Sequence, residues 1–304
     1  MDFGVHLPHL GRNAERDVLI SFAEEADRLG YHSAWTSDHI VGPASVDSIY
    51  PYSEDGSFPA PYDMAWLDPI ATLLFVASRT ENIKLGVTVM VIGYRMPIQT
   101  AKNYATLDQL SNGRAILGVG IGWNREEFEA LGMPWDNRGK RADEMLDLYE
   151  VLFTEQKPSF DGKYYQVPDL YFEPKPVNGH IPVWIGGDTE PAWRRTVERG
   201  DVFHAAFEKA DNIDTAWKRI GELCEEKGRD VAELGLSVRY FLDFDNLAEP
   251  EKSVAGSAEE MYERLGQLAE IGVDHVLLDP VARGGAAGKQ EAIVRFGEEI
   301  MPNV

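Results

Sequence analysis

The sequence predicts an α/β protein folded as a (β/α)8 TIM barrel with insertions. Three observations favour this fold. Short β-rich runs alternate with amphipathic helical patterns, eight such pairs fit along the chain, and the chain has 304 residues, somewhat more than the roughly 250 of a typical barrel. Strands that alternate with helices pair in parallel through crossovers. We therefore expect residues 1–304 to form one domain, with inserted loops at about 39–67 and 155–180.

Each predicted unit joins a run of β-branched and apolar residues to a stretch whose apolar residues recur every three or four positions. In the first helix, for example, Phe22, Ala23, Ala26 and Leu29 share one face. In chain order, the strand and helix of each unit are DFGVHL (2–7) with 14–29, HSAWTSD (32–38) with 68–80, NIKLGVTVMVI (82–92) with 97–111, RAILGVGIG (114–122) with 140–153, IPVWIGG (181–187) with 190–200, DVFHAAF (201–207) with 212–227, LGLSVRYFLDF (234–244) with 257–271, and VDHVLLDP (273–280) with 289–300.

An open doubly wound sheet is the structural alternative. That fold needs a G-x-G-x-x-G turn after its first strand, and VHLPHLGRN has none. GVGIGW (118–123) comes later and lacks the third glycine. Of the two long insertions, the first follows a strand and is expected at the active face, whereas the second follows a helix and has a structural interpretation.

The composition narrows the classes of partner and compartment. The chain carries 51 acidic and 29 basic residues, a formal charge of −22, which repels phosphate backbones and anionic lipids and argues against a nucleic-acid or membrane partner. Cys224 is the one cysteine, so an intrachain disulfide is excluded. The N-terminus lacks a secretory signal pattern, and no run approaches the roughly 20 apolar residues of a membrane span. We expect a cytoplasmic protein.

Candidate site residues follow from the fold, because catalytic groups of barrels lie just past the C-terminal ends of the strands. The residues at those positions are Pro8, His9, Ser37, Asp38, His39, Ile92 to Arg95, Gly122, Trp123, Asn124, Gly186, Gly187, Asp188, Thr189, His204 or Phe207, Asp243 and Asp279.

The run TSDHI (36–40) is the most suggestive of them. Adjacent Asp38 and His39 place one ionisable group near a ligand and the other against backbone donors, and histidine is the usual proton donor or acceptor near neutral pH. The alternative is a polar pair that caps loop or helix backbone. Placement at the end of the second strand favours the catalytic interpretation.

Three further segments have two interpretations each. WIGGDT (184–189) offers backbone N–H groups at a helix N-terminus, which suits a phosphate, or it is a tight turn capped by Asp188 or Thr189. GVTVMVIGYR (86–95) either lies against a flat three-ring cofactor or belongs to the barrel core. GVGIGW (118–123) either leaves room for a ligand with Trp123 as a wall, or packs closely at its glycines.

A metal-dependent barrel hydrolase is the main rival in chemistry, since such enzymes gather His and Asp at several strand ends. The H-x-x-H spacing of His6 and His9 along a strand predicts opposite faces rather than a chelating pair. We therefore expect no metal site. No lysine falls at the C-terminal end of a predicted strand, which disfavours a Schiff-base aldolase.

Several segments together resemble the bacterial luciferase-like monooxygenase superfamily. They are TSDH (36–39), residues 83–132, RGKRADE (138–144), residues 175–187, RTVERGDVF (195–203), AGSAEEMYERL (255–265) and GVDHVLL (272–278). Within that superfamily the chain looks most like the branch that uses coenzyme F420, an 8-hydroxy-5-deazaflavin. The Ser-Asp-His run and the insert YPYSEDGSFPAP (50–61) suggest this branch.

The resemblance implies an oxidoreductase that transfers a hydride between C5 of the deazaflavin and a small organic substrate. His39 would position the reacting face or handle a proton, and Asp38 would contact the ring or its polyol tail. A non-prolyl cis peptide behind the ring is expected near Thr88, Val89 or Met90. Gly186, Gly187, Asp188 and Thr189 would meet the cofactor phosphate, with Gly122 and Trp123 also at the cofactor. Homodimers are common in the family.

Trp123 also bears on the substrate. Family members that oxidise glucose 6-phosphate carry Glu directly after the Gly-x-Gly of the fourth strand, where this chain has Trp123. We therefore expect an apolar or aromatic substrate, with Trp35, Trp66, Tyr94 and Trp123 as candidate walls. An FMN-dependent monooxygenase of the same fold is the nearest alternative, and a non-catalytic flavin-binding protein is a remoter one.

Overall fold

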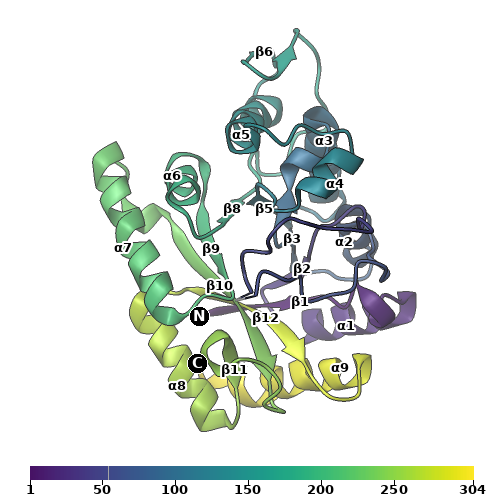
Figure 1. Cartoon of the computed structure of the whole chain (residues 1–304), viewed down its shortest axis with the longest axis vertical. Helices are drawn as coiled ribbons and strands as arrows, with labels where there is room; N and C mark the ends of the chain where they lie inside the picture. Colours follow the sequence, from purple (N-terminus) through teal and green to yellow (C-terminus); the bar gives the residue numbers. More distant parts are fainter. Residues whose placement is uncertain (54) are drawn as a thin grey trace.

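Eight parallel strands close into a barrel in this computed structural model, which describes residues 1–53 and 55–304 (Figure 1). In order around the barrel, they are β1 (Asp2–His6), β2 (Ser33–Thr36), β3 (Lys84–Val87), β5 (Ala115–Gly120), β8 (Val183–Gly186), β9 (Val202–Ala206), β10 (Gly235–Asp243) and β12 (His275–Val281). The barrel closes because β12 pairs in parallel with β1. The predicted TIM barrel is confirmed.

Helices surround the barrel, as Figure 1 shows for α1, α7, α8 and α9. The helices that follow the strands are α1 (Arg16–Leu29), α2 (Pro69–Ala77), α3 (Pro97–Leu110), α5 (Arg138–Thr154), α6 (Glu190–Arg199), α7 (Ala210–Lys227), α8 (Ala258–Ile271) and α9 (Ala286–Arg295). The main hydrophobic core lies between these helices and the strands, whereas Trp35, Ile116, Trp184 and Leu277 form a separate buried cluster.

The ends of these helices follow from local sequence. Asp68 accepts a hydrogen bond from the Ala71 amide and caps α2, whose first residue is proline. Ser257 and Glu260 form a reciprocal capping box at the start of α8. α1 ends at Gly30, which has a φ of 83°, a conformation that glycine adopts without steric cost.

The structure differs from the sequence prediction in four places. The predicted third strand, 82–92, is divided into β3 and β4 (Met90–Val91) by a non-prolyl cis peptide between Thr88 and Val89, at the place where one was expected. An additional helix, α4 (Arg125–Ala130), follows β5. The second insertion contains a small hairpin of β6 (Phe160–Asp161) and β7 (Gln166–Val167), and a short strand β11 (Ser253–Ala255) pairs with β10.

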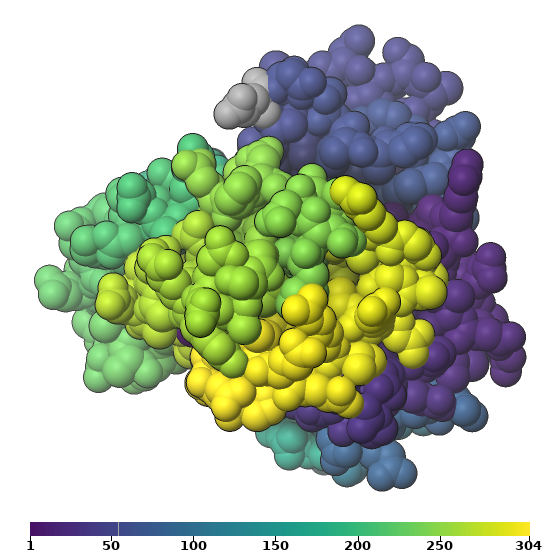
Figure 2. All heavy atoms as spheres, turned by 90° about the horizontal axis from the view of Figure 1, so that it is seen from below, coloured from purple at the N-terminus to yellow at the C-terminus, as the bar shows by residue number. Residues whose placement is uncertain are grey.

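The first insertion runs from the end of β2 to the start of α2 and forms no strand or helix in the part that the structure describes. In Figure 2 this indigo segment protrudes at one edge of the molecule. Across residues 1–53 and 55–304, every helix is too short or too polar to cross a bilayer. We call the C-terminal ends of the barrel strands the upper rim.

Candidate functional site

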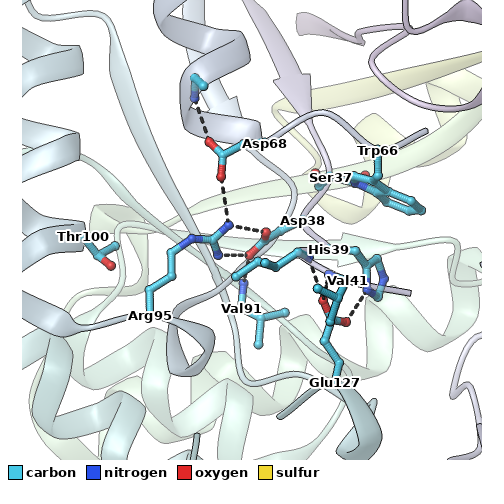
Figure 3. A network of polar contacts seen from close by, with 12 residues as sticks. Ser37, Asp38, His39, Val41, Trp66, Asp68, Val91, Arg95, Thr100 and Glu127 are labelled. Atoms are coloured by element: carbon cyan, nitrogen blue, oxygen red, sulfur yellow. Dashed lines mark hydrogen bonds and ion pairs between the residues drawn. The ribbon is translucent and has the colours of Figure 1, made fainter. Parts of the chain in front are cut away.

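Asp38 lies just past β2 at the upper rim and is paired with Arg95 (Figure 3). The two carboxylate oxygens accept hydrogen bonds from Arg95 Nη1 and Nη2 at 2.7 and 2.8 Å, and one also accepts from the Val91 amide at 2.9 Å. The Asp38 side chain is fully buried. Burial lowers the pKa of Arg95, but the Asp38 carboxylate outweighs burial and raises it overall. Asp38 thus ties the end of β2 to the segment after β3.

His39 points the other way and is held by Glu127 of α4. Its Nδ1 lies 2.6 Å from Glu127 Oε2, and the second carboxylate oxygen accepts the amides of Ile40 and Val41. Burial raises the pKa of Glu127, but the hydrogen bonds from His39 and these amides outweigh burial and lower it. An ionised Glu127 therefore keeps a proton on His39 Nδ1. His39 Nε2 has no hydrogen-bond partner within residues 1–53 and 55–304, so it is available to a ligand.

Glu127 was missed by sequence reasoning, although the sequence contains a signal for it. Asn124 caps α4 by accepting from the Glu127 amide, and a cap residue followed three positions later by Glu marks a helix start. The helix begins directly after the strand-end glycines, which brings the Glu127 carboxylate back under the loop that follows β2.

Aromatic rings enclose His39 on the open side. The His39 ring centroid lies 4.7 Å from that of Trp66, 5.3 Å from that of Phe58 and 6.3 Å from that of Trp123. Phe58 and Trp66 come from the first insertion, so this insertion belongs to the rim as expected. Trp66 and Trp123 thus both lie beside His39.

Two of the four predicted aromatic walls were wrong. Trp35 is fully buried inside the barrel, because it alternates with Ala34 and Thr36 along β2 and faces inward. Tyr94 is buried behind the rim, with its ring edge-on to Phe128 at 4.7 Å.

A second polar group occupies the rim beside Ser37. The Ser37 hydroxyl lies 2.8 Å from His6 Nε2 and 3.3 Å from Arg239 Nη1, and Arg239 Nη2 donates to Asp279 at 2.5 Å. Burial raises the pKa of Asp279, but neighbouring cationic groups, Arg239 among them, outweigh burial and lower it. This group therefore holds an ion pair at the barrel mouth.

The predicted separation of His6 and His9 was wrong. Their ring centroids are 5.2 Å apart, because β1 ends at His6 and strand alternation does not extend to His9. His9 is fixed by the Ser37 backbone, whose amide donates to Nε2 at 3.0 Å. Within the described part of the chain, no three His, Cys, Asp or Glu side chains are grouped to hold a metal ion.

The segment Thr88, Val89 and Met90 lies against small residues at the ends of β5 and β8. A Cβ added at Gly120 would lie 2.4 Å from Val89 Cγ2, and one at Gly186 would lie 2.7 Å from Val89 Cγ1. The glycines therefore make room for the Val89 side chain at the rim. Gly122 is also constrained, because it has a φ of 79° and a Cβ there would contact Val91 and Phe128.

The turn from β8 into α6 carries backbone amides just ahead of a helix N-terminus. The amides of Gly187, Asp188 and Thr189 donate no hydrogen bond to the described residues and precede the N-terminus of α6. Gly187 has a φ of 119°, which side-chain-bearing residues rarely adopt. A cavity of about 170 Å³ adjoins this turn and is lined in part by Tyr52, Asp188 and Glu208.

Two other strand-end candidates lie elsewhere. His204 lies within β9 and is fully buried inside the barrel rather than at the rim. Asp243, at the end of β10, accepts the amides of Asp245, Leu247 and Ala248 and so orders its own loop. Arg239, by contrast, was missed, because it lies inside the predicted seventh strand rather than after it.

Comparisons with known proteins agree on one family. A family model described as luciferase-like monooxygenase matches residues 1–249. An uncharacterised protein of Mycobacterium tuberculosis (strain ATCC 25618 / H37Rv) is 30% identical over 256 residues, which cover 84% of each chain. An F420-dependent glucose-6-phosphate dehydrogenase of Amycolatopsis mediterranei (strain U-32) is 30% identical over 281 residues, which cover 85% of this chain and 78% of that protein.

The fold is also found among solved structures. An F420-dependent secondary alcohol dehydrogenase in complex with an F420-acetone adduct superposes with a TM-score of 0.80, covering 99% of this chain and 98% of that chain. The two sequences are 18% identical, so this similarity concerns the fold.

Proposed function

Since the chain belongs to the luciferase-like monooxygenase family, a family of oxidoreductases, we propose that it is an F420-dependent enzyme that transfers a hydride between C5 of the deazaflavin and a small organic substrate. The observation that carries the proposal is the pair of His39 and Glu127 at the upper rim. An imidazole with Nδ1 fixed and Nε2 free suits proton exchange with a substrate hydroxyl or carbonyl. The F420-dependent relatives support this choice of cofactor.

The residues at the rim fit a deazaflavin with a phosphate-bearing tail. The free amides of Gly187, Asp188 and Thr189 would bind the phosphate together with the positive end of α6. Thr88, Val89 and Met90 would lie behind the ring, with Gly122 and Trp123 beside it. The cofactor, when bound, would supply the carbon that accepts or gives the hydride.

The chain's own residues have separable roles in this proposal. His39 would hold or take a proton at Nε2, and Glu127 would fix the tautomer and orientation of the ring. Asp38, whose carboxylate is fully engaged by Arg95 and Val91, would act as a positioning residue for the turn that carries His39.

Trp66, Phe58 and Trp123 around His39 favour an apolar or aromatic substrate. Aromatic side chains stabilise a bound ligand by burying its apolar surface, whereas a sugar phosphate needs cationic and hydrogen-bonding groups in the same place. The Arg239 guanidinium at the barrel mouth is already paired with Asp279.

Titration of the purified protein with coenzyme F420 and, separately, with FMN tests the proposal through cofactor fluorescence. We expect tight binding of F420 and weaker binding of FMN. Tight binding of FMN alone would reject the deazaflavin in favour of an FMN-dependent monooxygenase of the same family. In the protein that binds F420, His39→Ala should slow the hydride step by at least 10²-fold, and an unchanged step would contradict the role given to His39. Cofactor binding without hydride transfer in the wild-type protein would indicate a non-catalytic cofactor-binding protein.

A homodimer that acts on a small molecule in the cytoplasm, with no nucleic-acid or membrane partner, completes the proposal. Light scattering after size exclusion should give twice the mass of one chain, and a monomer at micromolar concentration would contradict this part.

A further inference from the structure

The interior of the barrel contains a continuous chain of polar side chains. Thr88 Oγ1 lies 2.9 Å from His204 Nε2, and His204 Nδ1 lies 2.9 Å from Ser237 Oγ. Ser237 Oγ lies 2.9 Å from His275 Nδ1, and His275 Nε2 lies 2.9 Å from Ser33 Oγ. Each imidazole uses both of its nitrogens and each serine joins two imidazoles, so the chain has no gap.

The two ends of the chain reach opposite faces of the barrel. At the lower end, Ser33 Oγ lies 3.2 Å from Nδ1 of His32, whose side chain is 20% exposed, and His32 Nε2 lies 3.6 Å from the exposed carboxylate of Asp2. At the upper end, Thr88 is one of the residues that the proposed function puts behind the cofactor ring. We call Thr88, His204, Ser237, His275, Ser33 and His32 the interior polar chain.

Strand register and glycine spacing build this chain. Ser237 of β10 is paired with His204 of β9 on one side and with His275 of β12 on the other, so the three side chains lie at one level. Gly4 leaves room for the next contact, since a Cβ there would lie 2.6 Å from Ser33 Oγ and 3.0 Å from His275 Nε2.

Aromatic rings pack against both buried imidazoles of the chain. Trp35 stacks on His204 with centroids 5.6 Å apart, and Trp184 contacts His275 edge-on at 4.8 Å. Barrel interiors are usually filled by branched aliphatic residues, which need no hydrogen bonds. A spanning polar chain therefore points to a use beyond packing.

The members of the chain have the protonation states that proton transfer needs. Burial lowers the pKa of His204 to about 3 and that of His275 well below its usual range, so both rings are neutral. A neutral imidazole donates from one nitrogen and accepts at the other, and a hydroxyl does both at once. Trp35 Nε1 donates to Ser33 without joining the path.

We propose that the interior polar chain is a proton relay that connects water at the lower face with Thr88 at the floor of the cofactor site. That the upper end serves a cofactor rests on the proposed function, because hydride gain at C5 of a deazaflavin requires a proton elsewhere on its ring. The relay itself is a property of the protein without cofactor.

The transfer is balanced along the chain. Each imidazole receives a proton at one nitrogen and gives one from the other, and each hydroxyl receives one proton and gives one at its single oxygen. One proton thus enters at His32 from water and one leaves from the Thr88 hydroxyl. Only N–H and O–H bonds break and form, and no electron moves. The transfer reverses the polarity of every hydrogen bond, and the same path returns a proton in the reverse reaction.

The first test is the tautomeric state of two histidines in the full-length wild-type protein without cofactor, read by ¹⁵N NMR of its histidine rings. Ser237 has one proton, so an unbroken path requires His204 and His275 to carry theirs on unlike nitrogens, one on Nδ1 and the other on Nε2. Protons on like nitrogens would interrupt the path at Ser237 and overturn the proposal.

The second test separates a conducting chain from a static one, by exchange of the His204 and His275 ring protons into D2O. Thr88→Val closes the upper end, after which protons reach His204 only from below. We compare the double variant Thr88→Val/Ser237→Ala with the single variant Thr88→Val. The exchange rate of the His204 ring proton should fall at least tenfold, whereas that of the His275 ring proton should stay within threefold. Equal rates at both rings would overturn the relay.

Two further variants complete the exchange experiment. Ser253→Ala in the Thr88→Val background is the matched control, because it also removes one buried hydroxyl, which donates to the Glu249 carbonyl outside the chain. It should leave both rates within threefold. Ser33→Ala in the same background breaks the chain lower down and should slow both rings at least tenfold, and it decides the question if the Ser237 variant does not fold.

Discussion

At the upper rim, buried carboxylates are held by an arginine or by hydrogen-bond donors, whereas inside the barrel the buried polar groups are neutral and joined end to end. Asp38 is engaged by Arg95, and Glu127 by His39. The interior polar chain contains no carboxylate or guanidinium and depends on hydroxyls between imidazoles. The rim can therefore keep charged side chains close to a ligand. Inside the barrel, an imidazole can carry a positive charge only transiently.

The largest expected effect is a loss of folding stability at low pH, caused by the neutral histidines inside the barrel. The pKa of His204 falls to about 3 and that of His275 lies well below its usual range, whereas both protonate near pH 6.5 in the unfolded chain. Lowered folded-state values mean that stability is complete above pH 6.5 and is lost as the pH falls below it. Between pH 7 and pH 5, each of these two rings should lower the free energy of unfolding by about 2 kcal/mol, so the pair should lower it by about 4 kcal/mol.

Urea unfolding at a series of pH values measures this loss. His204→Asn should reduce the loss between pH 7 and pH 5 by about 2 kcal/mol, because one titrating ring is absent, while His6 and His275, whose pKa values burial also lowers well below the usual range, continue to contribute. A wild-type free energy of unfolding that does not fall between pH 7 and pH 5 would contradict the description of a neutral interior.

Breaking the rim ion pair should have the next largest effect. Asp38→Asn removes the buried, bidentate charge partner of Arg95, and we expect the free energy of unfolding to fall by about 3 kcal/mol. Asp68→Asn is the control, since Asp68 contacts the same guanidinium at 3.4 Å but is half exposed, and asparagine keeps the cap of α2. Its expected loss is below about 1 kcal/mol, and equal losses would show that burial does not distinguish the two acids.

The rim was largely predictable from sequence, and the interior was not. Asp38 and His39 follow a strand end, so position along the chain was enough to select them. Glu127 required recognition of a helix only six residues long. Trp35 and His204 were placed at the pocket or rim because the inward face of a strand becomes known only when neighbouring strands fix its register. The interior polar chain joins residues from five segments, and no local pattern links these segments.

Removing Glu127, the partner of His39, should destabilise the rim less than removing Asp38. Glu127→Ala leaves the imidazole and the amides of Ile40 and Val41 without their acceptor, and we expect a loss of about 2 kcal/mol in thermal or chemical unfolding. Glu129→Ala removes an exposed carboxylate from the same helix, where its partner is Arg125, and should cost less than about 0.5 kcal/mol. A loss from Glu127→Ala no larger than that of Glu129→Ala would mean that the carboxylate does not organise the rim.

The smallest expected effect comes from adding a methyl group inside the barrel at Gly4. Gly4→Ala would put a methyl group 2.6 Å from Ser33 Oγ and 2.9 Å from Trp35 Nε1, so these side chains must shift, at a cost of about 1 kcal/mol. Gly266→Ala in α8 meets nothing within 4 Å and should stabilise the protein by up to about 1 kcal/mol, because alanine favours helix more than glycine does. If Gly4→Ala lowers the free energy of unfolding and Gly266→Ala raises it, the space around Ser33 is fully packed. A stabilising Gly4→Ala would mean that the interior has room for water beside its hydrogen bonds.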